Sequence, residues 1–257
     1  MKTPRLVTSV HNPLLQRVRR LSREALAYRK LDQVWVEGEH LCSALVSHGR
    51  EPATAIVSES ARRQPGLRAL ASQAAEVVCV PDAAFAEMSP LPSPAGIGML
   101  VSWQASQAPF EAVPTVVLDR IQDAGNVGSL LRSAGALGFV QVIALKGTAG
   151  LWAPKVLRAG MGAQFGLRMH EGLEEAALGT LKVPLVSTSP HASDRLDAAR
   201  LPWPCAWVFG HEGQGVSEGV RARCGREVRI PQPGGEESLN VAAAGAICLY
   251  ESVRGRQ

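Results

Sequence analysis

The stretch from residue 205 to residue 250 constrains the fold most, because it repeats one pattern twice. A short apolar run at 206–209 leads into the loop GHEGQG, and a second run at 228–230 leads into PQPGG. Apolar runs of this length, bounded by glycine and proline, predict buried strands. Glycine lets the main chain approach a ligand closely and present its N–H groups. The two units together predict a pocket built mostly from main chain.

An apolar segment follows the second loop. Residues 241–250 are long enough for about three helical turns and are apolar on nearly all sides. A helix with no polar face is typical of a protein interior. We therefore expect an interior helix directly after the second glycine-rich loop.

The rest of the chain alternates between strand and helix patterns, which predicts two α/β domains. We expect a first domain over 1–105, a polar, proline-bearing linker over 106–113 and a second domain over 114–257. In the first domain, leucines at helical spacing from 14 to 26 predict a basic amphipathic helix or helix pair. Its later expected strands are 33–36, 55–57, 77–80 and 97–101, and its later expected helices are 40–47, 67–74 and 82–88.

The second domain should contain a mostly parallel sheet with helices on both faces. Its expected strands before the two glycine loops are 115–118, 140–145 and 185–188, and its expected helices there are 126–137, 154–159 and 173–181. Ligands of such sheets bind beyond the carboxyl ends of the strands. The loops after Leu118, Thr188, Phe209 and Ile230 should therefore converge on one site.

The segment 126–132 offers a candidate for binding a phosphate or ribose. Asn126 is a natural N-cap, Gly128 leaves the first helical turn bare, and Arg132 follows Gly128 by four residues on the same face. An arginine in that position can grip a phosphate through two N–H groups. Taken alone, this segment is better explained by a capped helix with a solvated arginine.

Positive charge is concentrated near the N-terminus of a chain whose net charge is +4 and whose pI is near 9.0. Seven arginines and lysines lie between Arg5 and Lys30, before any concentration of acidic residues. Such clustering is typical of a surface that binds nucleic-acid phosphates, although a solvated helix face also produces it.

The five cysteines are scattered and have no metal-ligand spacing, and neither do the histidines, so we expect no metal. An odd cysteine count without a signal peptide predicts a reducing cytoplasm. No apolar run in the sequence approaches the length of a membrane span.

Three motifs in order resemble those of the SpoU/TrmH family, which are knotted RNA ribose 2′-O-methyltransferases that use S-adenosylmethionine. They are N-x-G-x-x-x-R at 126–132, F-G-x-E-x-x-G at 209–215 and I-P-x-x-G-x-x-x-S-L-N-V at 230–241. The segment KVLRAGMGA, with Lys155 and Arg158, is similar to the family's stretch between the first two motifs. TSVHNPLLQRVRRL and WVEGEHL are similar to the substrate-binding domain of many members, a small α/β fold shared with RNA-binding ribosomal proteins.

The resemblance implies a fold, partners and residue roles. We expect a trefoil knot in the second domain and a homodimer formed through that domain, with the site at the subunit interface. The implied catalytic set is Arg132, Asn126, Glu212, Ser238 and Asn240. The implied cofactor-binding set is Thr188, Gly210, Gly215, Ile230 and Leu239. The implied RNA-binding set is Arg17, Arg19, Arg20, Arg23, Lys155 and Arg158.

Three positions depart from the family's usual residues: Ala124 replaces a common proline, Gln232 a methionine and Ala242 a serine. They leave the substrate open. Ribosomal RNA is the first expectation, and transfer RNA or a resistance-type ribosomal target would use the same chemistry. A non-catalytic RNA-binding or ribosome-assembly protein is the alternative class. A dinucleotide enzyme is disfavoured because the glycine loops follow late strands and G-x-G-x-x-G does not follow the first one.

Overall fold

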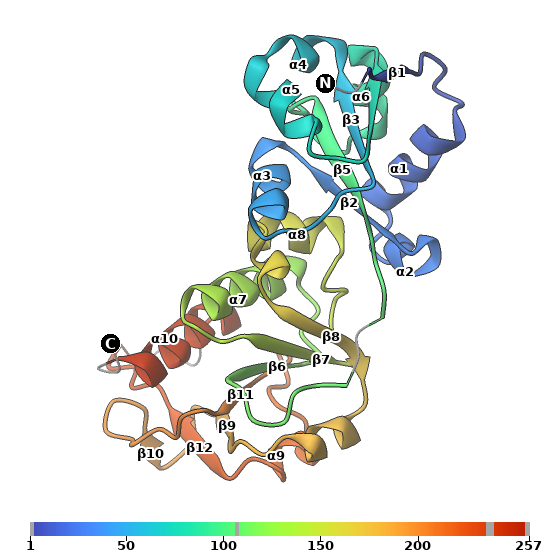
Figure 1. Ribbon diagram of the computed structural model, residues 1–257. Helices are drawn as coiled ribbons and strands as arrows, with labels where there is room; N and C mark the ends of the chain where they lie inside the picture. Colours follow the sequence, from blue (N-terminus) through green and yellow to red (C-terminus); the bar gives the residue numbers. More distant parts are fainter. Residues whose placement is uncertain (1–2, 106–107, 235–238, 255–257) are drawn as a thin grey trace. The chain divides into compact units, whose positions relative to one another are not determined.

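The computed structural model describes residues 3–105, 108–234 and 239–254, and it divides the chain into two compact units (Figure 1). The first unit combines Met1–Gln104 with Trp152–Phe165, and the second combines Ala105–Leu151 with Gly166–Gln257. The short segment Trp152–Phe165 thus packs with the first unit although it lies between strands of the second. The RNA-binding role of the first unit stays a prediction.

The first unit contains a five-stranded mixed sheet in the order β1-β4-β3-β5-β2. Its strands are β1 (Arg5–Leu6), β2 (Gln33–Glu37), β3 (Thr54–Ser58), β4 (Glu76–Val80) and β5 (Ile97–Ser102). Strand β5 runs antiparallel to both β2 and β3. The four strands expected from sequence are present. The two-residue β1 is an addition, and it is too short for hydrophobic periodicity to reveal.

The helices of the first unit cover this sheet. They are α1 (Pro13–Arg23), α2 (Ala27–Leu31), α3 (Glu39–Ser47), α4 (Glu59–Arg63), α5 (Pro65–Ala71), α6 (Asp82–Met88) and α8 (Pro154–Gly160). Helix α1 begins at Pro13 because the Asn12 side chain accepts a hydrogen bond from the Leu14 N–H at 2.9 Å. It buries Leu15, Val18 and Leu21, which confirms the amphipathic helix expected there.

The second unit contains a seven-stranded sheet in which every pair of neighbours is parallel. The strand order is β10-β12-β9-β11-β6-β7-β8. The strands are β6 (Thr115–Asp119), β7 (Gln141–Leu145), β8 (Arg168–Leu173), β9 (Leu185–Thr188), β10 (Asp194–Arg195), β11 (Ala206–Gly210) and β12 (Arg226–Arg229). The expected mostly parallel sheet is confirmed. The helix expected at 173–181 is wrong, because β8 and the 3-10 turn Glu175–Thr180 occupy that region.

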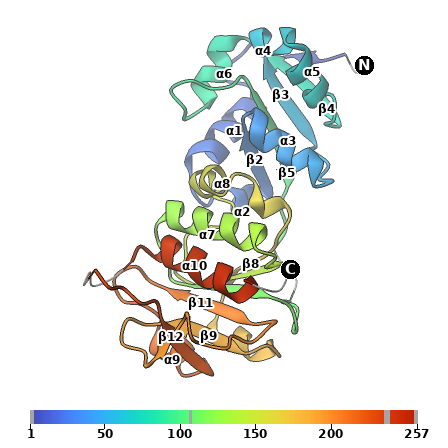
Figure 2. The same cartoon turned by 90° about the vertical axis from the view of Figure 1, so that its left-hand side faces the viewer.

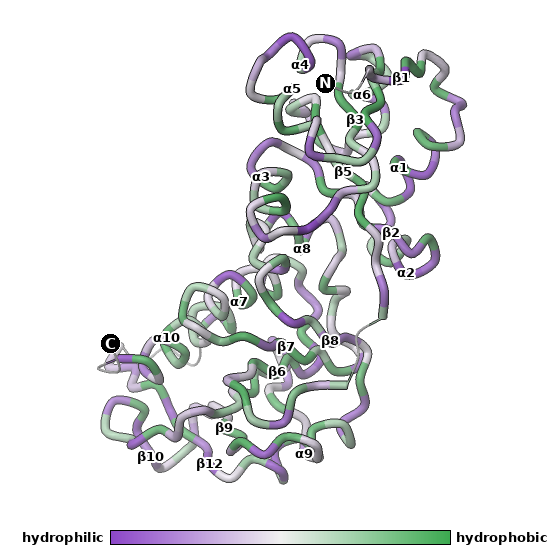
Figure 3. The backbone as a smooth tube through the Cα atoms, viewed as in Figure 1, coloured by the Kyte–Doolittle hydropathy of each residue, from purple (hydrophilic) through white to green (hydrophobic). Residues whose placement is uncertain are grey.

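Helical segments cover both faces of this sheet. On one face, α7 (Ala124–Ala136) and α10 (Val241–Val253) lie side by side (Figure 2). The indole N–H of Trp207 in β11 donates to the hydroxyl of Ser252 in α10 at 2.7 Å. On the other face, Leu178 of the 3-10 turn and Val220 of α9 (Glu218–Arg221) join a core cluster with strand residues such as Val117. Figure 3 shows that hydrophobic residues concentrate in the strands between these layers.

The expectation of an interior helix at 241–250 is wrong in one respect. Helix α10 forms there, but Ile247 and Tyr250 are 41% and 55% exposed. Its other face is buried through Gly245, Cys248 and Leu249. Helix α10 packs on the sheet through one face only. Because its sequence is apolar on nearly all sides, its opposite face leaves apolar residues exposed in this chain. Across the described residues, no helix is long and apolar enough to cross a membrane.

Candidate functional site

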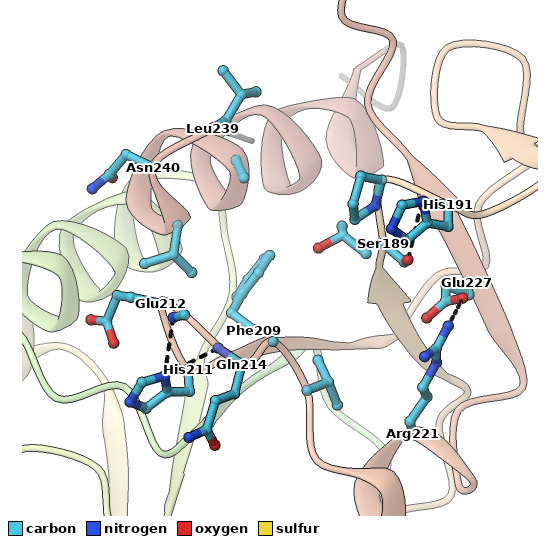
Figure 4. Close-up of a pocket in the computed structure, with 18 residues that line it drawn as sticks. Ser189, His191, Phe209, His211, Glu212, Gln214, Arg221, Glu227, Leu239 and Asn240 are labelled. Atoms are coloured by element: carbon cyan, nitrogen blue, oxygen red, sulfur yellow. Dashed lines mark hydrogen bonds and ion pairs between the residues drawn. The ribbon is translucent and has the colours of Figure 1, made fainter. Parts of the chain in front are cut away.

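A cavity of about 590 Å³ lies beyond the carboxyl ends of β9 and β11, beside the start of α10 (Figure 4). This confirms that the loops after Thr188 and Phe209 converge. Figure 4 shows Glu212 and Asn240 at one side of the cavity and the Arg221–Glu227 ion pair, 2.7 Å long, at the other. The described residues that line it are Thr188, Ser189, Pro190, His191, Phe209, Gly210, His211, Glu212, Gly213, Gln214, Gly215, Val216, Arg221, Glu227, Leu239, Asn240, Val241 and Ala244.

The loop after β11, residues 210–217, forms one wall of this cavity and folds tightly back on itself. His211 and Gly215 exchange two main-chain hydrogen bonds of 3.0 and 2.8 Å. Gly210 has to be glycine here, because a Cβ atom at this position would lie 2.1 Å from the main-chain carbon of Gly215. We call residues 210–217 the cofactor loop, after the cofactor that the motif resemblance implies.

Side chains from the three motifs meet at one side of the cavity. The Glu212 carboxylate accepts hydrogen bonds from the Asn126 side-chain amide at 3.1 Å and from the N–H groups of Asp123 at 3.1 Å and Gln122 at 3.3 Å. The side-chain oxygen of Asn126 in turn accepts from the Asn240 amide at 3.0 Å. Three of the five implied catalytic residues therefore form one hydrogen-bonded chain.

This environment changes the acidity of Glu212. Burial raises the pKa of its carboxyl group, but the hydrogen bonds from Asn126 and the main chain outweigh that effect and hold the pKa below its ordinary value. Glu212 is therefore a carboxylate at neutral pH and acts as an acceptor, fixing the loop after β6 to the cofactor loop.

The expectation that Asn126 caps α7 is wrong. The N-cap is Asp123, whose carboxylate accepts the Asn126 N–H at 2.8 Å. An ionised carboxylate next to the unpaired N–H groups of a first turn is a favourable cap. Asn126 lies inside the first turn, and its amide is free to bridge Glu212 and Asn240. Asn240 is itself the N-cap of α10, accepting from the N–H groups of Ala242 and Ala243.

The other implied site residues are placed as follows. Among the implied cofactor residues, Thr188, Gly210, Gly215 and Leu239 line the cavity, whereas Ile230 is not among its described lining residues. Arg132 is exposed, does not line the cavity and has no hydrogen bond or ion pair with any residue the structure describes. Ser238 lies outside the described residues.

The basic residues implied to bind RNA belong to the first unit. Four of them are bonded within that unit. Arg19 pairs with the Glu87 carboxylate, and Arg23 donates to the Glu87 carbonyl at 3.0 Å. Arg20 pairs with Glu24, the C-cap of α1, at 3.2 Å, and Arg17 donates to Gln33 at 3.3 Å. Lys155 is exposed and Arg158 half-buried on α8. Exposed pairs of this kind are weak, so these side chains can exchange partners with phosphates.

Sequence reasoning missed two residues that bond to the cofactor loop from β6. Asp119, 1% exposed, ends β6 and accepts the Ser217 N–H at 2.6 Å. Arg120 follows it with φ of +61°, a conformation that residues with a Cβ rarely adopt. It donates to Asp119 at 3.0 Å and to the Gln214 side chain at 3.0 Å. An aspartate directly after the apolar run Val116–Val117–Leu118 could have drawn attention, because buried carboxylates need partners.

Residues 114–250 match the model of the SpoU rRNA Methylase family. The chain belongs to this family. It is 30% identical over 96% of its length, and 93% of the relative's, to an uncharacterised tRNA/rRNA methyltransferase of Synechocystis. It is 29% identical to the 23S rRNA (guanosine-2′-O-)-methyltransferase of Pseudomonas putida, over 86% of this chain and 96% of that one. The SpoU methyltransferase AviRb of Streptomyces viridochromogenes, solved with its cofactor AdoMet, is 26% identical with a TM-score of 0.82, over 95% of this chain and 99% of that one.

Membership makes the protein an RNA methyltransferase with S-adenosylmethionine as its cofactor. The cavity fits that molecule in size and chemistry. Pockets for ligands of this size span about 300–1,000 Å³ and combine apolar walls with a few polar groups. Phe209, Leu239 and Val241 supply apolar lining, which suits an adenine ring, and Gly210, Gly213 and Gly215 supply main-chain groups that no side chain screens.

Proposed function

We propose that the protein methylates the ribose 2′-hydroxyl of a guanosine in 23S ribosomal RNA. The observation that carries this proposal is the hydrogen-bonded chain Asn240–Asn126–Glu212 beside the cavity. Support for the substrate comes from the Pseudomonas putida relative, whose name states this activity and which aligns over nearly its whole length. Both units of the chain take part in that alignment, so the likeness extends beyond the catalytic unit.

The cofactor supplies a methyl group bonded to a sulfonium sulfur. The neutral thioether that remains after transfer is a good leaving group. The protein therefore has to align the attacking 2′-oxygen, whose proton passes to solvent, and stabilise the negative charge that develops on this oxygen as the methyl–sulfur bond breaks. Glu212, Asn126 and Asn240 hold the cofactor loop, α7 and the start of α10 in one arrangement. This arrangement gives the ribose a fixed position relative to the methyl group.

Arg132 is the residue we assign to the reacting ribose. Guanidinium stays protonated in proteins, so it cannot serve as a general base. Its exposed side chain, which has no partner among the residues that the structure describes, is instead available to hold the neighbouring RNA phosphate and to stabilise the developing 2′-oxyanion. Replacement by lysine keeps the charge but removes the planar fork. Arg132→Lys should therefore lower kcat/KM for RNA at least tenfold, and near-normal turnover would contradict a bidentate contact.

A homodimer formed through the second unit accounts for two features. The apolar face of α10 with Ile247 and Tyr250 is exposed, and Arg132 does not line the cavity of its own chain. In a dimer that covers this face, the Arg132 of one copy can reach the cavity of the other. Ile247→Glu should then give a monomer in sedimentation experiments, and Val140→Glu, at a similarly exposed apolar residue outside α10, should not.

The test of function is ribose-methylation mapping of 23S RNA from a strain lacking the gene. We expect one 2′-O-methyl group to disappear in the cytoplasmic ribosomes of that strain. It should return with the wild-type gene but not with Asn126→Asp. The purified protein should then methylate 23S RNA from the deletion strain and not RNA from wild-type cells. A modification lost from transfer RNA instead would overturn the ribosomal assignment.

A further inference from the structure

We infer that Arg120, which lies outside the cavity, is a positioning residue that holds the cofactor loop in its binding conformation. This inference rests on S-adenosylmethionine as the ligand of the cavity. It adds a second connection to the cofactor loop, made by Asp119 and Arg120, which lie outside the three motifs.

The guanidinium of Arg120 bonds to both strand and loop. Its Nε donates to Asp119 Oδ1 at 3.0 Å, its Nη1 to Gln214 Oε1 at 3.0 Å and its Nη2 to the Gly215 carbonyl at 3.4 Å. The other oxygen of Asp119 accepts the Ser217 N–H at 2.6 Å. The pair Asp119–Arg120 therefore contacts three residues near the end of the cofactor loop. Because Asp119 is buried, this ion pair is shielded from the water that weakens exposed ones.

The main chain of Arg120 is held in the conformation that this contact requires. Its φ is +61°, and its N–H donates to the Thr148 hydroxyl at 3.0 Å, which itself donates to the Leu118 carbonyl at 2.9 Å. A Cβ on Gly147 would lie 3.2 Å from Arg120 Cγ, so the loop after β7 leaves little spare room there. Uncommon backbone conformations cost free energy and cluster at functional sites, so the positive φ of Arg120 is a reason to look for a function of this residue.

The two connections act at different points of the cofactor loop. Glu212 fixes its first half to residues 122, 123 and 126, and Arg120 fixes its second half at 214 and 215. Residues 210–216 all line the cavity, whereas Arg120 is absent from the described lining. Arg120 therefore acts on the cofactor through the loop. A loop already held in its bound conformation loses less entropy on binding, which strengthens affinity.

The experiment measures S-adenosylmethionine binding by calorimetry for wild type, Arg120→Met, Arg120→Lys and Arg120→Gly. Met removes the donors but keeps much of the side-chain length. Gly removes the side chain and adopts a positive φ without strain. Comparing Arg120→Gly with Arg120→Met therefore separates loss of the contact from backbone strain. Arg195→Met is the matched control, because Arg195 forms an exposed pair with Asp197 in the same unit and has no bond to the cofactor loop.

We expect Kd and KM for S-adenosylmethionine to rise about tenfold or more in both Arg120→Met and Arg120→Gly. Arg120→Lys should recover part of the affinity, and kcat at saturating cofactor should change less than about threefold in all three. Melting temperatures should show that each variant is folded, and Arg195→Met should bind as wild type does. Wild-type affinity in Arg120→Gly or Arg120→Met would overturn the inference while leaving the cofactor assignment intact. Failure of the wild-type protein to bind would overturn both.

Discussion

The side-chain amide of Asn240 donates to the side-chain oxygen of Asn126 across 3.0 Å, between residues 114 positions apart in the chain. This contact fixes which way the Asn126 amide points, because its nitrogen must then face Glu212. The oxygen of Asn240 is occupied by the first N–H groups of α10. Neither asparagine can turn its amide around without losing bonds at both ends.

Replacing Asn126 by aspartate should disrupt the site while barely changing its shape. A donor that faces Glu212 at 3.1 Å becomes an acceptor, and two carboxylates then face each other. We expect Asn126→Asp to lower kcat/KM at neutral pH by about 100-fold, since hydrogen bonds to charged groups contribute about 1.5–3 kcal/mol. Activity should partly recover at acid pH, where the two carboxyl groups can share a proton. Steady-state methylation assays between pH 5 and 8 measure this, and a variant that follows the wild-type profile would contradict the network.

Cofactor binding by the wild type should resist acid. The pKa of Glu212 is lower in the folded site than its ordinary value of 4.5, so the bonded carboxylate stabilises the site above that value. The stabilisation is lost only as pH falls through the lowered folded pKa. The contribution of Glu212 to the calorimetric affinity for S-adenosylmethionine should therefore stay level as pH falls from 7 to 5. Asn126→Ala removes one of the bonds that lower this pKa, so its affinity should begin to fall at a higher pH than that of the wild type.

Two glycines of the cofactor loop should respond very differently to alanine. A Cβ on Gly210 would lie 2.1 Å from the carbon and 2.2 Å from the nitrogen of the main chain at Gly215 and Val216, so the loop would have to move. A Cβ on Gly213 would meet only the His211 ring, at 3.9 Å. Gly210→Ala should weaken cofactor binding at least tenfold, and Gly213→Ala should leave it within about twofold. Equal affinities of the two variants in the same titration would show that the loop is not a rigid wall.

The cap of α7 should be measurable in stability as well as in activity. Asp123→Ala removes the acceptor of the Asn126 N–H, a loss that costs about 1 kcal/mol at a helix N-terminus. For a unit of this size, the melting temperature should fall by roughly 2–4 °C. Asp123→Ser retains a capping oxygen and should recover most of the loss. An unchanged melting temperature in Asp123→Ala would mean that the helix start is held by Glu212 and packing alone.

Hydrophobic periodicity and glycine positions were sufficient to place most elements and the site. Parallel strands bring their carboxyl ends to one edge of a sheet. The cavity therefore lies where the strands 185–188 and 206–209 end, and the glycines that follow 206–209 line it. The motif resemblance then identified Asn126, Glu212 and Asn240 as a set. Their mutual bonding depends on the crossing of three loops, which no local pattern contains.

The wrong expectations have a common physical origin in contacts between distant segments. Asparagine is a common N-cap residue, but in α7 the Asp123 carboxylate caps the helix. The side chain of Asn126 instead bonds to Glu212 and Asn240. Strand β8 was missed because its exposed Arg168 and half-buried Glu171 interrupt the apolar pattern. Arg120 contributes through a positive φ, and backbone conformation of this kind is not visible in residue identity.

The bond between Asn126 and Asn240 can form only after the ribosome has synthesised both residues. Ribosomes add about 5–20 residues per second, so roughly 6–23 s separate the synthesis of two residues 114 positions apart. During that interval β6, α7 and the cofactor loop have been made, while the residue that completes their connection has not. A nascent chain therefore carries most of the second unit before it carries the complete hydrogen-bonded chain Asn240–Asn126–Glu212.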